Sequence, residues 1–361
     1  MNTVNSSNPS ITQQERIAAL DMIRGLALFG ILFINAGAYK VIVEGTPMPD
    51  YTGLNGIISS LIDIFVEKKF FSMFSFLFGA GFYIFASRAE SRGDKPRLRF
   101  ARRLLALLLL GIIHFLFFWG SILAVYAVIG FLLIPFYRVK ASTTARWLGA
   151  LIFIHIISLL LDIFSPEIRG FSQVTAFAGN DAAAIFIMFL SGFLAAKARW
   201  ISRPNDFSKQ MRTVRLVSLP CFIGISIWTW YASQGHDPHM DNIIALGAIP
   251  AAYFYLASLF QLLQHDRIAK YFRPIARVGQ MALTNYWAQS FIGLAIISFM
   301  NLETVSPVHI VIISVLTFTI QILYSVVWFQ FIPMGPLEKV WRFMTYGRKP
   351  LHREHHNEAV S

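Results

Sequence analysis

Long apolar stretches alternate with short polar connections along most of the chain. About 20 apolar residues let a helix cross the hydrocarbon core of a bilayer, where only helices and closed barrels satisfy their backbone hydrogen bonds. The stretches are continuous and rich in Phe, Leu and Ile, which favours helices. The pattern predicts an all-α, polytopic membrane protein with about ten transmembrane helices, at residues 17–39, 70–87, 100–118, 122–137, 147–164, 182–198, 216–232, 243–263, 281–300 and 308–332.

The remaining segments flank or interrupt this predicted transmembrane domain, which covers residues 16–335. Residues 54–66 carry Asp63 and are too short to cross a bilayer, so we expect an interfacial or re-entrant helix there. Residues 1–15 are polar and lack basic residues, which indicates a disordered cytoplasmic lead rather than a signal peptide. Residues 336–361 are expected to form a basic cytoplasmic tail.

Basic residues gather in every second connection between the predicted helices. Of the 31 Lys and Arg residues, 26 lie in these connections, at residue 16 or in the tail. Positively charged loops remain on the cytoplasmic side of a membrane, which predicts that both termini are cytoplasmic. The same distribution explains the net charge of +12 without a nucleic-acid partner.

Composition excludes several other classes of protein. A chain that is 56% hydrophobic and 14% charged is too apolar for a water-soluble globule. The single cysteine, Cys221, excludes an intrachain disulfide and a multi-cysteine zinc site. The loop at residues 236–241 holds two His and two Asp, but Pro238 prevents the helical His pair of a zinc protease. Solvated surface is the default interpretation of this loop, and no metal is predicted.

Asp21 and Arg24 stand inside the first apolar stretch, where a charge costs at least ~2.5 kcal/mol on insertion scales. On a helix they are one turn apart, and Asn35 lies almost three turns beyond Arg24, about 16 Å away on the same face. The simplest arrangement is a polar stripe that faces the interior of the bundle. The stripe is either a structural clamp or a functional site in which Arg24 binds a phosphate or carboxylate.

Depth divides the other intramembrane polar residues into two sets. The predicted cytoplasmic set is Asp21, Arg24, Arg277, Thr284, Asn285 and Glu338, and the predicted outer set is Asn35, Lys68, Lys69, Ser72, His114, Ser121, Asp162 and His309. A donor site inside and an acceptor site outside would need this division, although any polytopic protein has polar residues toward both helix ends. His114 is the best candidate for a general base, and a histidine hydrogen-bonded to a neighbouring helix is the alternative.

The stretch RIAALDMIRGLALFGILFIN at residues 16–35 resembles the YeiB-like family of membrane proteins, which is domain of unknown function 418. Four further stretches resemble it in the same order, at residues 68–82, 102–130, 279–290 and 335–347. The Leu-Asp-x-x-Arg-Gly signature of the first helix is also distantly similar to transmembrane acyltransferases such as heparan-alpha-glucosaminide N-acetyltransferase. This second resemblance implies transfer of an acyl group from cytoplasmic acyl-CoA to an acceptor, often a sugar, on the far side.

Two positions depart from the patterns of these families. The acyltransferases carry a histidine shortly before an Asn-Gly pair, whereas Asp50 to Gly53 precede Asn55 and Gly56 here. YeiB-like proteins have Asp in a Gly-Asp-Ile-Leu stretch, where this chain has Ser121. The histidine and the carboxylate that would orient a base are therefore absent from those positions.

The preferred hypothesis is an acyltransferase of the bacterial inner membrane. Its proposed donor is acyl-CoA, such as acetyl-CoA, and its partners are the bilayer and a small-molecule or glycan acceptor. Donor binding is assigned to Asp21, Arg24, Arg277 and Asn285, and catalysis to His114 and Asn35. Arg102 and Arg103 would attract the phosphates of the coenzyme. The alternatives are a transporter or flippase of a small metabolite or lipid, and a non-catalytic membrane partner.

Overall fold

The computed structural model describes residues 13–39, 51–165, 172–201 and 206–347, and these residues form helices and no strand. The first half contains α1 (Gln13–Ala38), α2 (Gly53–Phe65), α3 (Lys69–Ser91), α4 (Pro96–Phe115), α5 (Leu123–Gly130), α6 (Ala141–Phe164) and α7 (Ser172–Gly179). The second half contains α8 (Asp181–Lys197), α9 (Ser208–Gly235), α10 (Met240–Leu262), α11 (Asp266–Gln280), α12 (Ala282–Phe299), α13 (Pro307–Phe331) and α14 (Pro336–Tyr346). The predicted all-α class is confirmed.

Six helical segments of the described chain are long and apolar enough to cross a bilayer. They are Ala18–Ala38, Gly53–Ser91, Ala141–Phe164, Ser208–Gly235, Met240–Leu262 and Pro307–Phe331. Helices α7 and α8 meet at an angle of 43° and together form a seventh candidate. The protein is therefore a helical membrane protein with six or seven candidate spans, and the count of ten stays a prediction.

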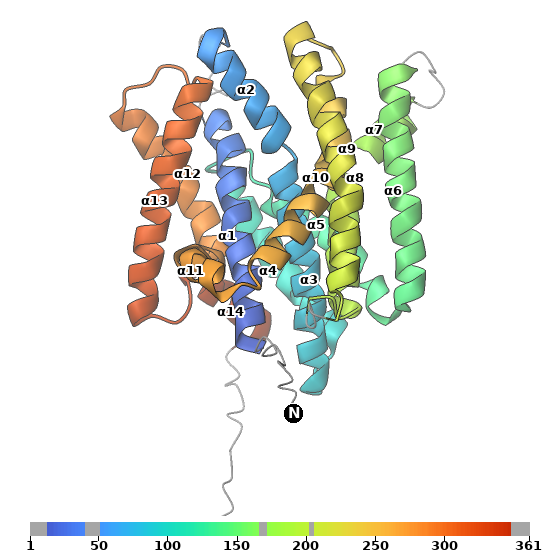
Figure 1. Cartoon of the computed structure of the whole chain (residues 1–361). Coiled ribbons are helices and arrows are strands. Elements are labelled where there is room, and N and C mark those ends of the chain that lie inside the picture. The colour runs from blue at the N-terminus through green and yellow to red at the C-terminus, as the bar shows by residue number, and fades with distance from the viewer. Residues whose placement is uncertain (1–12, 40–50, 166–171, 202–205, 348–361) are drawn as a thin grey trace, which may run out of the picture.

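The helices stand side by side, with α2 at the upper end in Figure 1 and with α11 and α14 toward the lower end. Helix α1 is central, because it packs against α3, α11, α12 and α13. Its buried side chains Leu28 and Leu32 belong to the same apolar cluster as Phe318 of α13. The two short 3-10 turns Phe131–Leu133 and Pro135–Arg138 follow α5, and the first of them packs against α8.

Glycine allows α3 and α8 to cross in close contact. A Cβ atom added to Gly79 would lie 1.9 Å from the carbonyl oxygen of Phe189, and one added to Gly192 would lie 1.8 Å from that of Phe76. Small residues permit such approaches between membrane helices, where van der Waals packing replaces the hydrophobic effect as the driving force. Gly79 and Gly192 therefore permit the close packing of α3 against α8.

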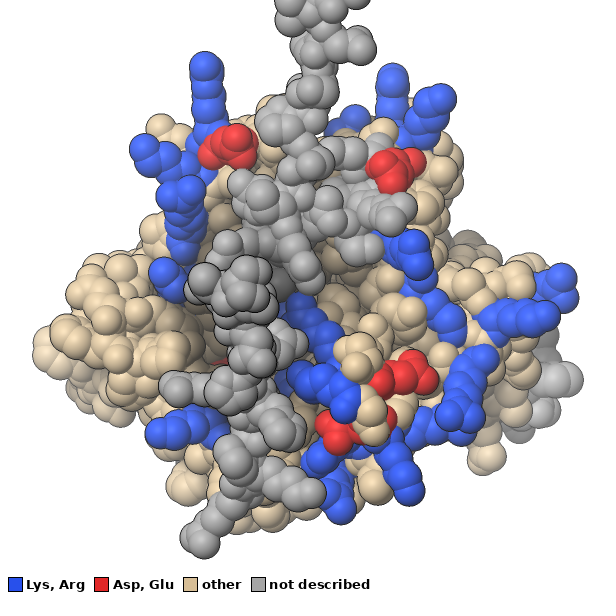
Figure 2. All heavy atoms as spheres, turned by 90° about the horizontal axis from the view of Figure 1, so that it is seen from below, with Lys and Arg blue, Asp and Glu red and all other residues tan. Residues whose placement is uncertain are grey.

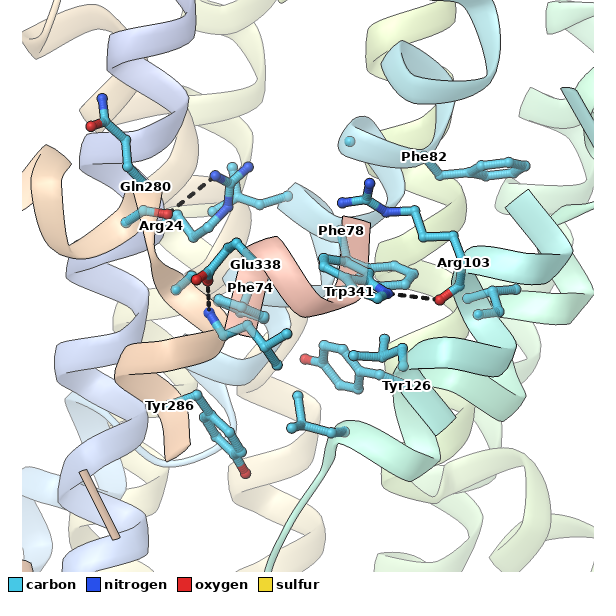
Figure 3. Close-up of a pocket in the computed structure, with 18 of the residues that line it drawn as sticks. Arg24, Phe74, Phe78, Phe82, Arg103, Tyr126, Gln280, Tyr286, Glu338 and Trp341 are labelled. Carbon is cyan, nitrogen blue, oxygen red and sulfur yellow. Dashed lines mark hydrogen bonds between the residues drawn. The ribbon is translucent and has the colours of Figure 1, made fainter. Parts of the chain in front are cut away.

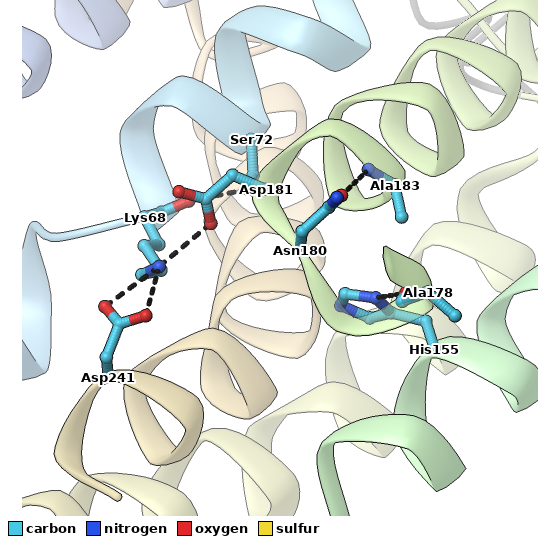
Figure 4. Close-up of polar contacts among 8 residues, drawn as sticks. All are labelled: Lys68, Ser72, His155, Ala178, Asn180, Asp181, Ala183 and Asp241. Carbon is cyan, nitrogen blue, oxygen red and sulfur yellow. Dashed lines mark hydrogen bonds and ion pairs between the residues drawn. The ribbon is translucent and has the colours of Figure 1, made fainter. Parts of the chain in front are cut away.

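A buried lysine joins three helices at the upper end of the bundle. Lys68 Nζ lies 2.9 Å from Asp181 Oδ1 on α8 and 3.0 Å from Asp241 Oδ1 on α10 (Figure 4). The backbone of Lys68 adopts a left-handed conformation with φ of 60°, in the turn between α2 and α3. Beside it, Asn180 caps α8 by accepting a hydrogen bond from the Ala183 amide at 2.9 Å. Lys68 therefore holds the α2–α3 turn on the bundle.

The folded unit extends beyond the boundary predicted at residue 335. Helix α14 packs against α4 and α12, and Trp341 Nε1 donates a hydrogen bond to the Arg103 carbonyl oxygen at 2.8 Å. Residues 336–346 therefore belong to the helical body, whereas 348–361 and the predicted lead at residues 1–12 lie outside the described residues. Helix α2 coincides with the segment predicted at 54–66, whose interfacial or re-entrant position stays a prediction.

The substitution Gly79→Ala should destabilise the protein, because its methyl group would displace the α8 backbone. We expect the free energy of unfolding to fall by about 1–3 kcal/mol, as in other overpacked cores. Gly81→Ala is the matched control on the same helix, since no atom lies within 4 Å of the added Cβ. Thermal unfolding in detergent measures both variants, and equal melting temperatures would contradict the packing role of Gly79.

Candidate functional site

Arg24 lies where the backbones of α1 and α11 come into contact. A Cβ atom on Gly25 would lie 2.3 Å from the carbonyl oxygen of Ile275, and one on Gly279 would lie 1.9 Å from that of Asp21. Because both positions are glycine, Arg24 Nη1 reaches the Gly279 carbonyl oxygen at 3.3 Å and Asp21 Oδ1 at 2.6 Å. The ion pair that the one-turn spacing predicts is therefore present, and it is fixed to a second helix.

A cavity of about 210 Å³ opens beside Arg24. Figure 3 shows Arg24 and Arg103 on opposite walls, while Tyr126 and Tyr286 lie toward the other end. The apolar part of the wall consists of the side chains Phe74, Leu77, Phe78 and Phe82 of α3, Phe100, Leu104 and Leu107 of α4, Leu123 of α5, and Ala282 and Leu283 of α12. The cavity thus combines cationic groups at one end with an aromatic and aliphatic interior.

Arg103 presents a positive charge to this cavity without a close acidic partner. Its guanidinium carbon lies 3.7 Å from the ring centroid of Trp341 and 4.7 Å from that of Phe85. No carboxylate oxygen of the described residues lies within 4 Å of its nitrogen atoms. A guanidinium held between rings keeps its charge available for a bidentate contact with phosphate or carboxylate.

A wider hollow, which we call the vestibule, adjoins the cavity and has a volume of about 530 Å³. It shares Arg24, Arg103 and Trp341 with the cavity, and it adds Arg88, Arg92, Arg342 and Tyr346 among other residues. Figure 2 views the molecule from below and shows Lys and Arg side chains distributed around this face. Five arginines line the vestibule together with two acidic residues, Asp21 and Glu338. The net charge of the lining is therefore positive, which attracts anions to the vestibule.

Glu338 forms the boundary between the cavity and the start of α12. Its Oε1 accepts hydrogen bonds from the amides of Leu283 at 2.7 Å and Thr284 at 3.2 Å, and its Oε2 accepts one from Thr284 Oγ1 at 2.6 Å. A carboxylate at a helix N-terminus satisfies free amides and interacts favourably with the helix dipole. Glu338 therefore docks α14 on α12 and holds one wall of the cavity.

His114 is fully buried at the upper end of α4, in a second polar cluster. Its Nδ1 lies 2.9 Å from Ser121 Oγ, and its Nε2 lies 3.3 Å from Ser290 Oγ on α12. The imidazole stacks on Trp287 with ring centroids 4.9 Å apart. A histidine held by hydroxyl groups on both nitrogens has a defined orientation, and either nitrogen can carry the proton.

Tyr286 separates the cavity from the His114 cluster. Its ring lines the cavity and also meets the His114 ring edge to face, with centroids 5.4 Å apart. Its hydroxyl accepts a hydrogen bond from the Ile122 amide at 3.1 Å and faces the side chains of Asn35 and Ser121. The Tyr286 side chain therefore contacts both the cavity beside Arg24 and the His114 cluster.

Comparison with known proteins places the chain in a family. The family described as "Protein of unknown function (DUF418)" matches residues 195–348. An uncharacterized 39.9 kDa protein from the amylase 3' region of Bacillus acidopullulyticus is 31% identical over 94% of this chain and 96% of its own length. The chain belongs to the YeiB-like DUF418 family. No solved structure matches it.

Two other relatives of this DUF418 protein also match over almost their whole length. YxaH of Bacillus subtilis (strain 168) is 28% identical over 95% of this chain and 97% of its own, and YeiB of Escherichia coli (strain K12) is 26% identical over 92% and 96%. All three relatives are described as uncharacterized. Membership confirms the predicted family, while the function has to be inferred from the site.

The structure brings together only part of the predicted donor site of this DUF418 protein. Asp21 and Arg24 line the vestibule, but Arg277 is exposed on α11, where it donates to Gln280 Oε1 at 3.0 Å. Asn285 is fully buried on the other face of α12. It donates to the Val278 carbonyl oxygen and Ser325 Oγ, and it accepts from Tyr324. Neither Arg277 nor Asn285 lines the cavity or the vestibule.

The two residues predicted to be catalytic, His114 and Asn35, both lie on the side of Tyr286 away from Arg24. Asn35 is 8% exposed, and its Nδ2 has no hydrogen-bond partner among the described residues. Arg24 and Asn35, which the sequence aligns on one face of α1, thus lie on opposite sides of the Tyr286 ring. With no hydrogen-bond partner among the described residues, this Nδ2 group can donate a hydrogen bond to a polar ligand.

Sequence reasoning missed the aromatic residues that shape the site. Trp341, Tyr126 and Tyr286 are not among the candidate site residues that the sequence predicts. Tyr286 lies in the stretch GQMALTNYWAQS, next to the residues that carry the family resemblance, which was the available signal. The position of Trp341 against Arg103 depends on how α14 docks on α4, which no local pattern predicts.

Replacement of Glu338 by alanine should release α14 from α12, because three hydrogen bonds to a charged group are lost. Such bonds contribute about 1.5–3 kcal/mol each, so we expect amide exchange in residues 336–346 to accelerate at least about tenfold. Hydrogen exchange with mass spectrometry measures this change. Lys339→Ala, at an exposed neighbouring position, is the control. Unchanged protection of α14 in Glu338→Ala would show that other contacts dock the helix.

Proposed function

We propose that this DUF418 protein is a membrane acyltransferase that moves an acyl group, such as acetyl, from cytoplasmic acyl-CoA to an acceptor on the outer side. The acceptor is a small molecule or a glycan. One observation carries the proposal: a basic vestibule leads through an aromatic cavity to Tyr286, and His114 lies directly behind that ring. The vestibule would hold the phosphates, the cavity would hold the thioester, and His114 would act as the general base, which is the order that acyl transfer needs.

The phosphates of acyl-CoA match the vestibule, and its acyl group matches the cavity. Its phosphates are polyanionic and would bind at the vestibule arginines, with Arg103 the strongest candidate since it lacks a close carboxylate partner. Arg24 is partly neutralised by Asp21 and would contact a phosphate or the thioester carbonyl oxygen. The acyl group itself is apolar and would enter the interior lined by Phe74 and Phe78.

The transfer step needs Tyr286 to turn aside so that the acceptor and the thioester meet. His114 would take the proton from an acceptor hydroxyl or amine as its oxygen or nitrogen attacks the thioester carbonyl carbon. The carbon–sulfur bond then breaks, and the proton passes from His114 to the departing thiolate. Ser121 holds His114 Nδ1, the role that the carboxylate of the family pattern would otherwise perform. Asn35 would orient the acceptor.

The proposal includes an orientation in the membrane. Acyl-CoA is cytoplasmic, so the vestibule face must be cytoplasmic, and the distribution of Lys and Arg on that face supports this assignment. We infer ten membrane crossings, both termini in the cytoplasm and a location in the bacterial inner membrane. The bilayer is then the immediate partner of the protein, and the His114 end of the bundle faces the outer side.

Purified wild-type protein should bind acetyl-CoA, and Arg24→Ala should weaken that binding at least about tenfold. Loss of one charge-assisted bidentate contact is about 1.5–3 kcal/mol, which exceeds the 1.4 kcal/mol that corresponds to a tenfold change. Isothermal titration in detergent measures the affinity. Arg267→Ala is the matched control, because it removes an exposed arginine of α11 that lines neither space. Equal binding by wild type and Arg24→Ala, or binding by neither, would refute the donor site.

His114→Ala should lower the rate of acyl transfer at least about 10²-fold and leave acetyl-CoA affinity unchanged, as expected for loss of a general base. The assay follows radiolabel from acetyl-CoA into any product in membrane vesicles. Transfer should require acetyl-CoA on the cytoplasmic face, so inverted vesicles should be active and right-side-out vesicles inactive.

The control for this experiment is His155→Ala, which removes a buried histidine whose one hydrogen bond among the described residues is to the Ala178 carbonyl oxygen. Full activity in His114→Ala would exclude the proposed base. Activity from the outer face would reverse the proposed orientation. Movement of a labelled solute across proteoliposomes without any acyl donor would instead support a transporter.

A further inference from the structure

A second cavity, distinct from the one beside Arg24, lies in the lower half of the bundle. It has a volume of about 510 Å³, within the range of about 300–1,000 Å³ typical of ligand sites. Its walls come from α3, α6, α8, α9 and α10, which contribute Phe76, Leu148, Ala195, Val214 and Phe260 among other residues. No residue of the vestibule or of the His114 cluster lines it, so the acyltransferase proposal does not account for it.

The interior of this cavity offers almost no hydrogen-bonding capacity to a ligand. Ser191 Oγ lies 2.6 Å from the Tyr253 hydroxyl, and it also donates to the Ile187 carbonyl oxygen at 2.8 Å. These two side chains therefore satisfy each other. Small residues such as Ala145 and Ala195 leave the space open between the helices. An occupant of this interior has to be apolar and flexible, as an alkyl chain is.

Basic residues adjoin the lining residues of the same cavity along the chain. In the sequence, residues 138–146 and 197–215, which contain several of the lining residues, hold three and six Lys or Arg residues respectively, and Asp206 is their single acidic residue. Lys140 precedes the lining residue Ala141, Arg146 follows Ala145, and Arg212 follows Met211, and all three basic residues are exposed. Lys197 is engaged elsewhere, because its Nζ donates to backbone carbonyl oxygens such as that of Tyr137 at 3.0 Å.

We propose that this cavity binds one acyl chain of an anionic phospholipid, whose headgroup lies among Lys140, Arg146 and Arg212. The apolar interior favours an alkyl chain, and the neighbouring basic residues independently favour a negatively charged headgroup. Basic pockets between membrane helices bind anionic headgroups in this manner. The site lies in the leaflet next to the basic face, which is the same face as the vestibule.

Native mass spectrometry tests the proposal on full-length protein extracted in detergent with equimolar phosphatidylglycerol and phosphatidylcholine. Wild type should retain phosphatidylglycerol in preference to phosphatidylcholine. Ala195→Phe, which fills the cavity, should reduce retained phosphatidylglycerol at least about tenfold. The control Ala150→Phe adds the same ring to an exposed position of α6 that does not line the cavity.

The headgroup is tested separately by the double variant Lys140→Gln, Arg212→Gln, which should abolish the preference for phosphatidylglycerol. Its control, Arg267→Gln with Lys270→Gln, removes two exposed charges from α11 and should retain the preference. Equal retention by Ala195→Phe and Ala150→Phe would overturn the chain site. Equal binding of both lipids by wild type would overturn the headgroup assignment.

Trp200 provides a second measurement that does not depend on the folding of a variant core. Its side chain lines the cavity, and it stacks on Phe207 with centroids 5.9 Å apart. Phosphatidylglycerol with brominated chains should quench the fluorescence of wild type more than that of Trp200→Phe. Identical quenching of the two proteins would show that no lipid chain enters beside Trp200 and would overturn the proposal.

Discussion

The need to stabilise the charge of Arg24 within a membrane helix is the constraint on which the rest of the site depends. An intramembrane arginine is tolerated when other groups of the protein solvate it. Here Asp21 on the same helix and the Gly279 carbonyl oxygen on α11 do so. The carbonyl is within reach only because Gly25 and Gly279 let the two backbones touch. That contact positions the end of α11, and hence the start of α12, where Glu338 docks α14 and completes the cavity.

The two polar levels of the protein are separated by an aromatic layer, and this separation defines how the site would work. Arg24 and Arg103 belong to a space that widens toward the basic face, whereas His114 and Asn35 lie behind Tyr286. The Tyr286 ring lines the cavity and contacts the His114 ring, so in the proposed acyl transfer it is the residue at which donor and acceptor would meet.

The sequence predicts one donor site from Asp21, Arg24, Arg277 and Asn285, and the structure places the first two on the vestibule and the other two away from it. Asp21 and Arg24 lie on one helical turn, so their contact follows from local geometry. Arg277 and Asn285 were assigned to the same site because they lie at a similar depth, and depth does not determine which way a side chain points. Asn285 faces α13 and binds Ser325, while Arg277 lies on the exposed side of α11. Rotation about a helix axis is set by tertiary packing, which a single hydrophobic pattern constrains weakly.

The sequence by itself determined the helical membrane class, the family, the basic face and the polar pair in α1, because each follows from composition, apolar length or spacing within one helix. Only the tertiary structure decided that α14 forms a wall of the cavity, that Arg103 is held between Trp341 and Phe85, and that Tyr286 stands between Arg24 and His114. These contacts join residues far apart in the chain. They depend on close approaches between helices, at Gly25, Gly79 and Gly279, that bring otherwise ordinary aromatic side chains to one place.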